Sequence, residues 1–375
     1  MKTYLGEEND NMSIFIDSFS NKETKDTTNV FKLDSETVYI SNLDFTIINA
    51  NIKDSVNYAV TNAGGNLQQL SIEGPNFSSK IRGLYFKDKF KLDVVNLSTD
   101  FSYSKTTMTF LNTTLQTNNS NVKGAIVFDY STKDLADFVN KVQINAAFDT
   151  SNLAVKDVRL FYKELSGNDL FTFKGDFKGT LNDFKLNSFK IFNKKNLFID
   201  GDLAFVNAIN ADDNFTFNAN LNKFSATYNE LNTLLPNSIG KSVPKNFSAL
   251  AVFRGEGNLT ISPKQIEANL YVTSAIGDIA TDLKLDNYNN SSLAAYQGVF
   301  ELDKFHIGKF IDDPLFGAIS LKGDINGIGL QLADSATTFS GEISEFDFKD
   351  YTYTKISTNG NYKNNRFEGV LSVND

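Results

Sequence analysis

The sequence predicts a mostly β protein: an elongated open groove of many stacked amphipathic strands with a few short helices. Apolar and polar residues alternate along most of the chain, as in the segment 215–221, and a period of two is typical of a strand with one dry and one wet face. The composition suits strands, with 34 Phe and 14 Tyr but only 5 Pro in 375 residues. About 25 strand-like segments are too many for one sandwich, so they are expected to curl into a long trough.

Two regions are expected along the chain. Residues 1–29 form a polar N-terminal segment with a short strand at 14–16, and residues 30–375 form the groove. Early strands are predicted at 38–40, 45–47, 90–94 and 122–130. Clusters of Asn, Asp and Gly tolerate the left-handed backbone of tight turns. They predict turns at Ala63-Gly64-Gly65-Asn66, Gly74-Pro75-Asn76, Asn118-Asn119-Ser120, Asp212-Asp213-Asn214 and Asn364-Asn365.

Three short segments change from strand spacing to helical spacing. The first is 133–139, for which Thr132 is the predicted N-cap. The second is 228–235, which Pro236 ends, and the third is 305–311, which ends before Pro314. Strands follow each of them, so the chain resembles a degenerate repeat of a short helix and then strands.

The apolar residues that share one parity are expected to line the groove. Phe suits a lining because it is large and carries no polar group that needs a partner. A closed, dry core would produce the same pattern, and that interpretation stays open from the residues alone. The candidate lining residues, chosen by parity, are Phe171, Phe173, Phe177, Leu203, Phe205, Phe215, Phe217, Leu221, Ile319 and Leu321.

Charge and chemistry argue against several classes of function. The formal net charge of −9 disfavours nucleic-acid binding, and no run of basic residues predicts contact with anionic lipid head groups. Cys is absent and His306 is the single histidine, so neither a thiolate nor a His-based metal site is expected. Paired carboxylates such as Asp312 and Asp313 suit helix ends. We expect no catalytic residue, no metal and no cofactor. The N-terminus lacks a signal-peptide pattern, and the longest apolar run, 249–253, is too short for a membrane helix.

Residues 305–371 carry the most specific sequence motif. The segment Asp313-Pro314-Leu315-Phe316-Gly317 follows the third helix, and glycines at 323 and 327 end the next strand. The segments 339–353 and 360–371 read as further strands with glycine-spaced hairpins. This region resembles the AsmA-like superfamily and, within it, the TamB family, in the Asn-, Lys- and Phe-rich style of TamB-like proteins of Bacteroidota. The resemblance implies an internal or N-proximal fragment of such a protein.

The resemblance also implies a fold and a function. The fold is a stack of parallel strands curled into an open groove, called a β-taco. Such proteins are anchored in the inner membrane, here by a segment outside this sequence, and they span the periplasm. Their groove conducts phospholipid acyl chains to the outer membrane. TamB has also been linked to outer-membrane protein assembly with a BamA-family partner, so docking of unfolded β-strands is the alternative function. An extracellular β-solenoid adhesin is the second alternative.

Overall fold

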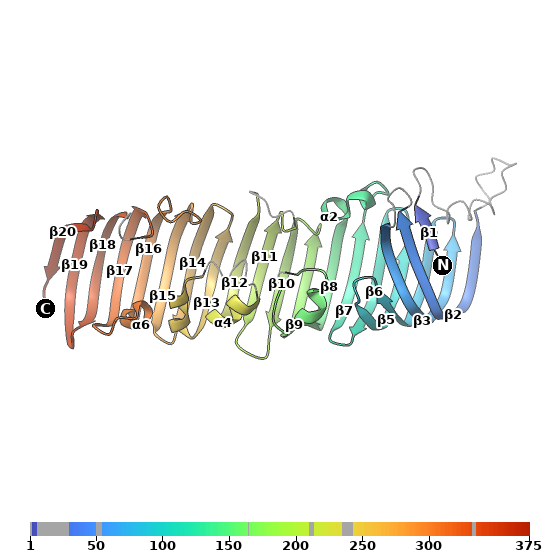
Figure 1. Ribbon diagram of the computed structural model, residues 1–375, viewed down its shortest axis with the longest axis horizontal. Coiled ribbons are helices and arrows are strands. Elements are labelled where there is room, and N and C mark those ends of the chain that lie inside the picture. The colour runs from blue at the N-terminus through green and yellow to red at the C-terminus, as the bar shows by residue number, and fades with distance from the viewer. Residues whose placement is uncertain are drawn as a thin grey trace. The chain divides into compact units, whose positions relative to one another are not determined.

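The computed structural model describes residues 2–5, 30–49, 55–163, 165–209, 214–234, 243–331 and 335–375. The chain is mostly β, forms an open antiparallel sheet and has few short helices, which confirms the predicted fold class at that level. It divides into two compact units, residues 1–180 and 181–375. Figure 1 shows the strands and helices of both units.

The first unit is a series of antiparallel strands in chain order, with a short parallel strand paired to β2. Short helices follow β7 and β8. The described elements are β1 (Lys2–Leu5), β2 (Lys32–Asn49), β3 (Ser55–Glu73), β4 (Asn76–Asp88), β5 (Asp93–Tyr103), β6 (Thr107–Thr117), β7 (Asn121–Asp129), η1 (Asp134–Asp137), α2 (Phe138–Lys141), β8 (Gln143–Ala154), α3 (Val155–Val158) and β9 (Leu170–Gly179).

The second unit repeats this plan, and its helices again lie at strand ends. Its described elements are β10 (Phe184–Phe192), β11 (Phe198–Val206), β12 (Thr216–Thr227), α4 (Tyr228–Leu234), η2 (Lys245–Leu250), β13 (Val252–Ile261), β14 (Gln265–Ser274), β15 (Gly277–Asp286), β16 (Ala295–His306), α6 (Ile307–Ile311), β17 (Phe316–Ile328), β18 (Ala336–Phe348), β19 (Tyr351–Lys363) and β20 (Arg366–Val373).

Strand direction differs from what the resemblance implied. Consecutive strands are antiparallel from β2 to β9 and from β10 to β20, and a parallel pair among the described strands joins β1 to β2. The physical reason is the length of the connections. Two residues join β3 to β4, and two join β19 to β20. A parallel pair needs a crossover of roughly a dozen residues or more, which these turns do not provide.

Several local predictions are confirmed and others are wrong. Turns form at 74–75, 118–119 and 364–365, and β7 covers the strand predicted at 122–130 except for its last residue. The strands predicted at 38–40 and 45–47 are parts of the single strand β2, and the chain turns at 89–90 before β5 begins. The turn predicted at 63–66 lies inside β3. Gly64 does not form a turn there. Its lack of a side chain makes room for Tyr85, because a Cβ on Gly64 would lie 2.5 Å from Cζ of Tyr85.

The helix predictions hold with two corrections. Helix α4 spans almost all of the predicted segment, and η1 with α2 covers the first one. Thr132 does not cap the first of these helices. Instead, the Ser131 amide donates a hydrogen bond of 2.7 Å to Oδ2 of Asp134. Helix α6 begins at Ile307 because Phe305 and His306 still pair with β17. The predictions at 14–16 and at 212–213 lie outside the described residues.

The long strands are bent by β-bulges that share one hydrogen-bonding arrangement. A residue with positive φ on one strand donates its amide to an Asp or Ser side chain of the neighbouring strand. A bulge bends its strand and increases the local twist, which curves a sheet. The pairs are Asn62 with Asp44 (2.8 Å), Gly83 with Ser98 (3.1 Å), Ser188 with Asp202 (2.7 Å) and Lys304 with Ser320 (2.9 Å).

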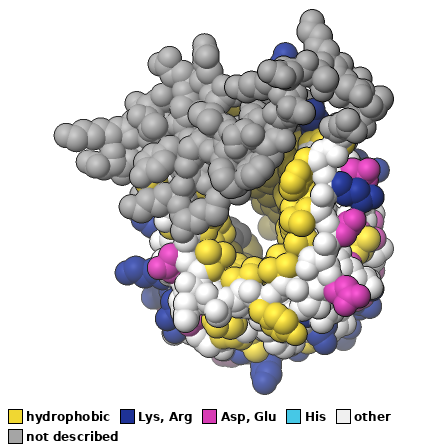
Figure 2. Space-filling view, turned by 90° about the vertical axis from the view of Figure 1, so that its right-hand side faces the viewer, with side chains coloured by type: hydrophobic (Ala, Val, Ile, Leu, Met, Phe, Trp, Pro, Cys, Tyr) yellow, Lys and Arg dark blue, Asp and Glu magenta, His cyan; other side chains and the backbone are white. Residues whose placement is uncertain are grey.

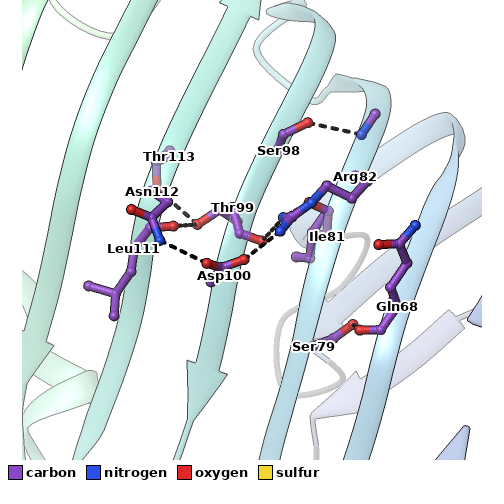
Figure 3. Close-up of polar contacts among 11 residues, drawn as sticks. Gln68, Ser79, Ile81, Arg82, Ser98, Thr99, Asp100, Leu111, Asn112 and Thr113 are labelled. Carbon is purple, nitrogen blue, oxygen red and sulfur yellow. Dashed lines mark hydrogen bonds and ion pairs between the residues drawn. The ribbon is translucent and has the colours of Figure 1, made fainter. Parts of the chain in front are cut away.

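Figure 3 shows the bulge region of β4, β5 and β6. Arg82 donates to the carbonyls of Ile81 and Thr99 and pairs with Asp100 at 2.6 Å, and the hydroxyl of the fully buried Thr99 meets that of Thr113 at 2.8 Å. Hydrogen bonds from Arg82 and Asn112 hold the pKa of Asp100 below its ordinary value. Side chains therefore satisfy polar groups in the region where the strand ladders shift register.

Candidate apolar groove

Residues that face one another across neighbouring strands point to the same side of a sheet. In the second unit this rule gives a continuous apolar row from β10 to β16. The rings of Phe184 and Phe205 are 4.7 Å apart, and those of Phe205 and Phe217 are 4.9 Å apart. The row consists of Phe184, Phe205, Phe217, Ile261, Ile266, Leu285 and Tyr296.

A second apolar row runs beside the first on the same face. It consists of Leu186, Leu203, Ala219, Leu259, Ala268 and Leu283. The alternate positions form the other face, and most of them are polar. They include Asn218, Thr260, Glu267, Lys284, Gln297 and Asn326, with an ion pair of 3.4 Å between Lys284 and Glu267. The second unit thus separates its two faces by polarity over many consecutive strands.

The first unit carries a comparable apolar row, which parity alone did not single out. Ring centroids follow one another at 5.6 Å from Phe77 to Phe101, 4.9 Å from Phe101 to Phe110 and 6.1 Å from Phe110 to Phe128. Phe138 of α2 adds a ring 5.8 Å from Phe128. The alternation within each strand indicated an apolar face, but only the register between strands brings these rings next to one another. In Figure 2, hydrophobic side chains line the inner side of a hollow and charged ones lie on its outer side.

The ten candidate lining residues fall into two groups by burial. Phe171, Phe173, Leu203 and Ile319 are buried to 8% exposure or less, so neighbouring side chains cover them. The others are half-buried and remain accessible: Phe177, Phe205, Phe215, Phe217, Leu221 and Leu321. The structure places Phe205 opposite Phe217, and Leu221 opposite two glycines, Gly201 and Gly257. Phe215 precedes β12 by one residue.

Glycines on the apolar face make room for aromatic rings of the neighbouring strands. A Cβ on Gly255 would lie 2.9 Å from the ring of Phe224, and one on Gly323 would lie 2.8 Å from the ring of Phe339. Covering a strand glycine with a cross-strand ring stabilises the pair and pins its register. This packing explains why glycines recur in the Phe-rich strands.

One margin of the second unit's apolar face is closed by helices. Leu250, Ile276, Phe305 and Ile319 form a buried cluster, against which α6 and the end of η2 pack. Asn246 of η2 donates to the carbonyl of Phe310 in α6 at 2.7 Å, which ties the two helices together. The margin is therefore a small buried core. Phe205, Phe217 and Leu221, in contrast, stay half-buried.

Glu230 holds the start of α4 against the β10–β11 turn. Its Oε1 accepts hydrogen bonds from Asn193 Nδ2 and from the amides of Asn196 and Leu197, and its Oε2 accepts two from Thr227. Burial by itself raises the pKa of Glu230, but these donors outweigh burial and bring the pKa below its ordinary value of 4.5.

This carboxylate predicts a pH dependence of stability. Because the pKa of Glu230 is lower in the folded state, its contribution is complete above about pH 4.5 and is lost as the pH falls through the folded-state pKa. We expect Glu230→Gln to lower the free energy of unfolding by about 1 kcal/mol at neutral pH, allowing for solvent screening. The difference from wild type should shrink in acid. Denaturant unfolding at several pH values measures it, and a difference that grows in acid would contradict this assignment.

The described residues contain no group of three or more His, Cys, Asp or Glu side chains arranged to hold a metal ion. Among those same residues, none of the helices has the length and apolar character needed to cross a membrane.

No protein-family model matches the sequence, and comparisons with curated proteins and with solved structures gave no match. The residue pattern of 305–371 and the geometry of the apolar face are therefore the observations that bear on function.

Proposed function

We propose that this chain is a segment of a phospholipid transport bridge of the TamB type. It would lie in the periplasm and conduct acyl chains along its apolar face between the inner and outer membranes. The observation that carries the proposal is the apolar row of the second unit, which crosses β10 to β16 while Phe205 and Phe217 remain half-buried. A closed core of this composition would bury them.

The energetics suit passive movement of a lipid tail. Neighbouring strands are roughly 4.8 Å apart, so each strand adds one further step of apolar surface to the row. Each methylene removed from water gains about 0.8 kcal/mol, and a chain that slides from one strand to the next keeps that gain. The lipid head group would stay in water outside the groove. No step requires a catalytic side chain or a cofactor, so the proposal is of a non-enzymatic protein.

The partners follow from the same proposal. Phospholipid acyl chains are the ligand, and an inner-membrane anchor belongs to a part of the protein outside this sequence. An outer-membrane protein of the BamA family is the proposed terminal partner. Nucleic acid is not a proposed partner, because the chain has a formal net charge of −9.

A second candidate function is docking of unfolded outer-membrane β-strands by edge pairing. The observation that favours it is that the sheet is open rather than closed into a barrel, so its edge strands present backbone groups that can pair with another chain. Strand addition uses main-chain hydrogen bonds for affinity and side-chain pockets for specificity. It would survive a charge placed on the apolar row, whereas conduction of acyl chains would not.

Site-specific photocrosslinking in a bacterial periplasm tests the first function. A benzophenone amino acid replaces Phe205 on the apolar row or, as the matched control, Asn220 on the opposite face of the neighbouring strand. We expect phospholipid adducts at position 205 and none at position 220. Adducts with polypeptide alone at position 205 would favour strand docking, and equal lipid adducts at both positions would refute a one-sided groove.

A further inference from the structure

The fold of the first unit brings exposed aromatic side chains together at one end of its strands. Phe90 lies in the β4–β5 turn, and Phe161 and Tyr162 follow α3, yet the rings of Phe90 and Phe161 are only 5.1 Å apart. Phe161 is 56%, Tyr162 53% and Phe90 43% exposed. Large apolar side chains grouped on a surface mark an interaction site more often than single exposed ones do.

Basic residues flank these aromatic residues along the chain. Lys89, Lys91, Lys156 and Lys163 are exposed, and Nζ of Lys89 lies 5.0 Å from the ring centre of Phe90. Together, the segments 87–93 and 156–163 hold six basic and three acidic residues, a net charge of 6 − 3 = +3 in a chain of net charge −9. Glu164, which follows, lies outside the described residues. We call these two segments the aromatic-basic rim.

The three acidic residues of the rim are engaged with neighbouring groups. Asp93 pairs with Lys87 at 3.7 Å, and Oδ1 of Asp88 accepts the Leu92 amide at 2.8 Å. Asp157 is buried and accepts three hydrogen bonds from the β6–β7 turn. Their donors are Thr117 Oγ1 (2.5 Å), Ser120 Oγ (2.6 Å) and Asn119 Nδ2 (2.7 Å). Asp157 therefore fixes α3 to the rim, and the side chains that point to solvent are mainly basic or aromatic.

We propose that the aromatic-basic rim docks the first unit on the surface of an anionic lipid bilayer. Aromatic side chains favour the boundary between head groups and acyl chains, and each Lys or Arg near an anionic surface adds to the attraction. Such a patch is not visible in the sequence, because its basic residues lie in two segments that are far apart in the chain. This proposal is independent of acyl-chain conduction by the second unit.

Vesicle flotation of the full chain tests the proposal. The probes are vesicles of phosphatidylcholine alone and vesicles that also contain phosphatidylglycerol. We expect binding only to the anionic vesicles, and we expect it to weaken when the salt rises from about 0.1 M to about 1 M, since the Debye length falls from about 10 Å to about 3 Å. Inorganic phosphate at matched ionic strength should not compete, because a bilayer rather than a single phosphate group is the ligand.

Two triple variants of equal charge change distinguish the rim from general electrostatics. The test variant is Lys89→Gln, Lys91→Gln and Lys156→Gln. The control variant is Lys105→Gln, Lys133→Gln and Lys141→Gln, which lie at the opposite ends of the first unit's strands. We expect the test variant to lose at least about tenfold in affinity for anionic vesicles. The control variant should lose less than about threefold, an effect of net charge alone.

Aromatic variants probe insertion separately from charge. Phe161→Ser with Tyr162→Ser should weaken vesicle binding, whereas Tyr39→Ser, at a position 79% exposed on β2, should not. Circular dichroism of each variant verifies that it is folded. Equal loss in the two triple variants, or no binding of the wild-type chain to anionic vesicles, would overturn the proposal and leave the rim as a contact for a protein.

Discussion

Replacing Phe217 by Asp is expected to remove phospholipid from the purified chain. Phe217 lies in the middle of the apolar row, with the Phe205 ring 4.9 Å away and Ile261 directly opposite on β13. A carboxylate there must keep its water, so an acyl chain that crosses the row would force its desolvation, at a cost of several kcal/mol. We expect at least a tenfold fall in co-purified lipid, because about 1.4 kcal/mol already corresponds to a factor of ten. Lipid extraction followed by mass spectrometry measures the change.

Two further variants separate loss of the groove from loss of the fold. Asn220→Asp adds the same charge to β12 but on the polar face, and it should retain the lipid. Thr281→Asp places the charge on the apolar face at a position that is already polar, between Leu270 and Phe300, so its folding cost is smaller. Thr281→Asp should lose lipid as Phe217→Asp does. Full lipid content in a folded Phe217→Asp protein would show that the apolar row is not the lipid path.

Replacing Gly257 by Val is expected to be among the most damaging substitutions for the fold. Gly257 of β13 lies between Leu221 and Leu270, with a φ of +128°. A Cβ there would clash with the carbonyl oxygen of Asn269 and lie 3.0 Å from Cα of Leu270, so backbone atoms would have to move. We expect the free energy of unfolding of the second unit to fall by at least about 3 kcal/mol, from backbone strain and overpacking together. Denaturant unfolding followed by circular dichroism measures this loss.

Gly83 offers a matched glycine at which substitution should be tolerated. Its φ is +63°, and a Cβ there would meet no atom within 4 Å. Asn adopts this left-handed conformation more readily than most residues do. Gly83→Asn should therefore change the free energy of unfolding by less than about 1 kcal/mol. Similar losses at Gly257 and Gly83 would contradict the account of close strand packing at Gly257.

The sequence predicted the strand content and the two-faced character of the sheet well, because both follow from a period of two. Phe205 and Phe217 have the same parity on their strands, and the register does place them opposite one another. Parity could not predict how deeply each of these side chains is buried. Ile319 and Leu321 look alike in the sequence, yet Ile319 is part of the buried cluster below α6, whereas Leu321 packs against it from outside.

What the sequence could not predict depends on contacts between distant segments. Gly64 and Gly65 resembled a turn, but cross-strand contacts, with Tyr85 at Gly64 and with the Leu84 backbone at Gly65, make them part of β3. Bulge residues such as Ser188 and Lys304 have no local signature, since the acceptors of their amides lie on another strand. The aromatic-basic rim combines two segments in the same way. Short connections, by contrast, are local, and they could have predicted antiparallel pairing.

Native mass spectrometry with lipid extraction is the most direct test of an open groove that binds acyl chains. The chain is expressed in a bacterial periplasm and purified without detergent, so that any bound lipid comes from the cell. With an open groove, we expect phospholipid bound in stoichiometric amounts to the wild-type protein. A monodisperse wild-type protein free of lipid would contradict it, because the half-buried Phe205 and Phe217 would then belong to a surface that acyl chains do not occupy.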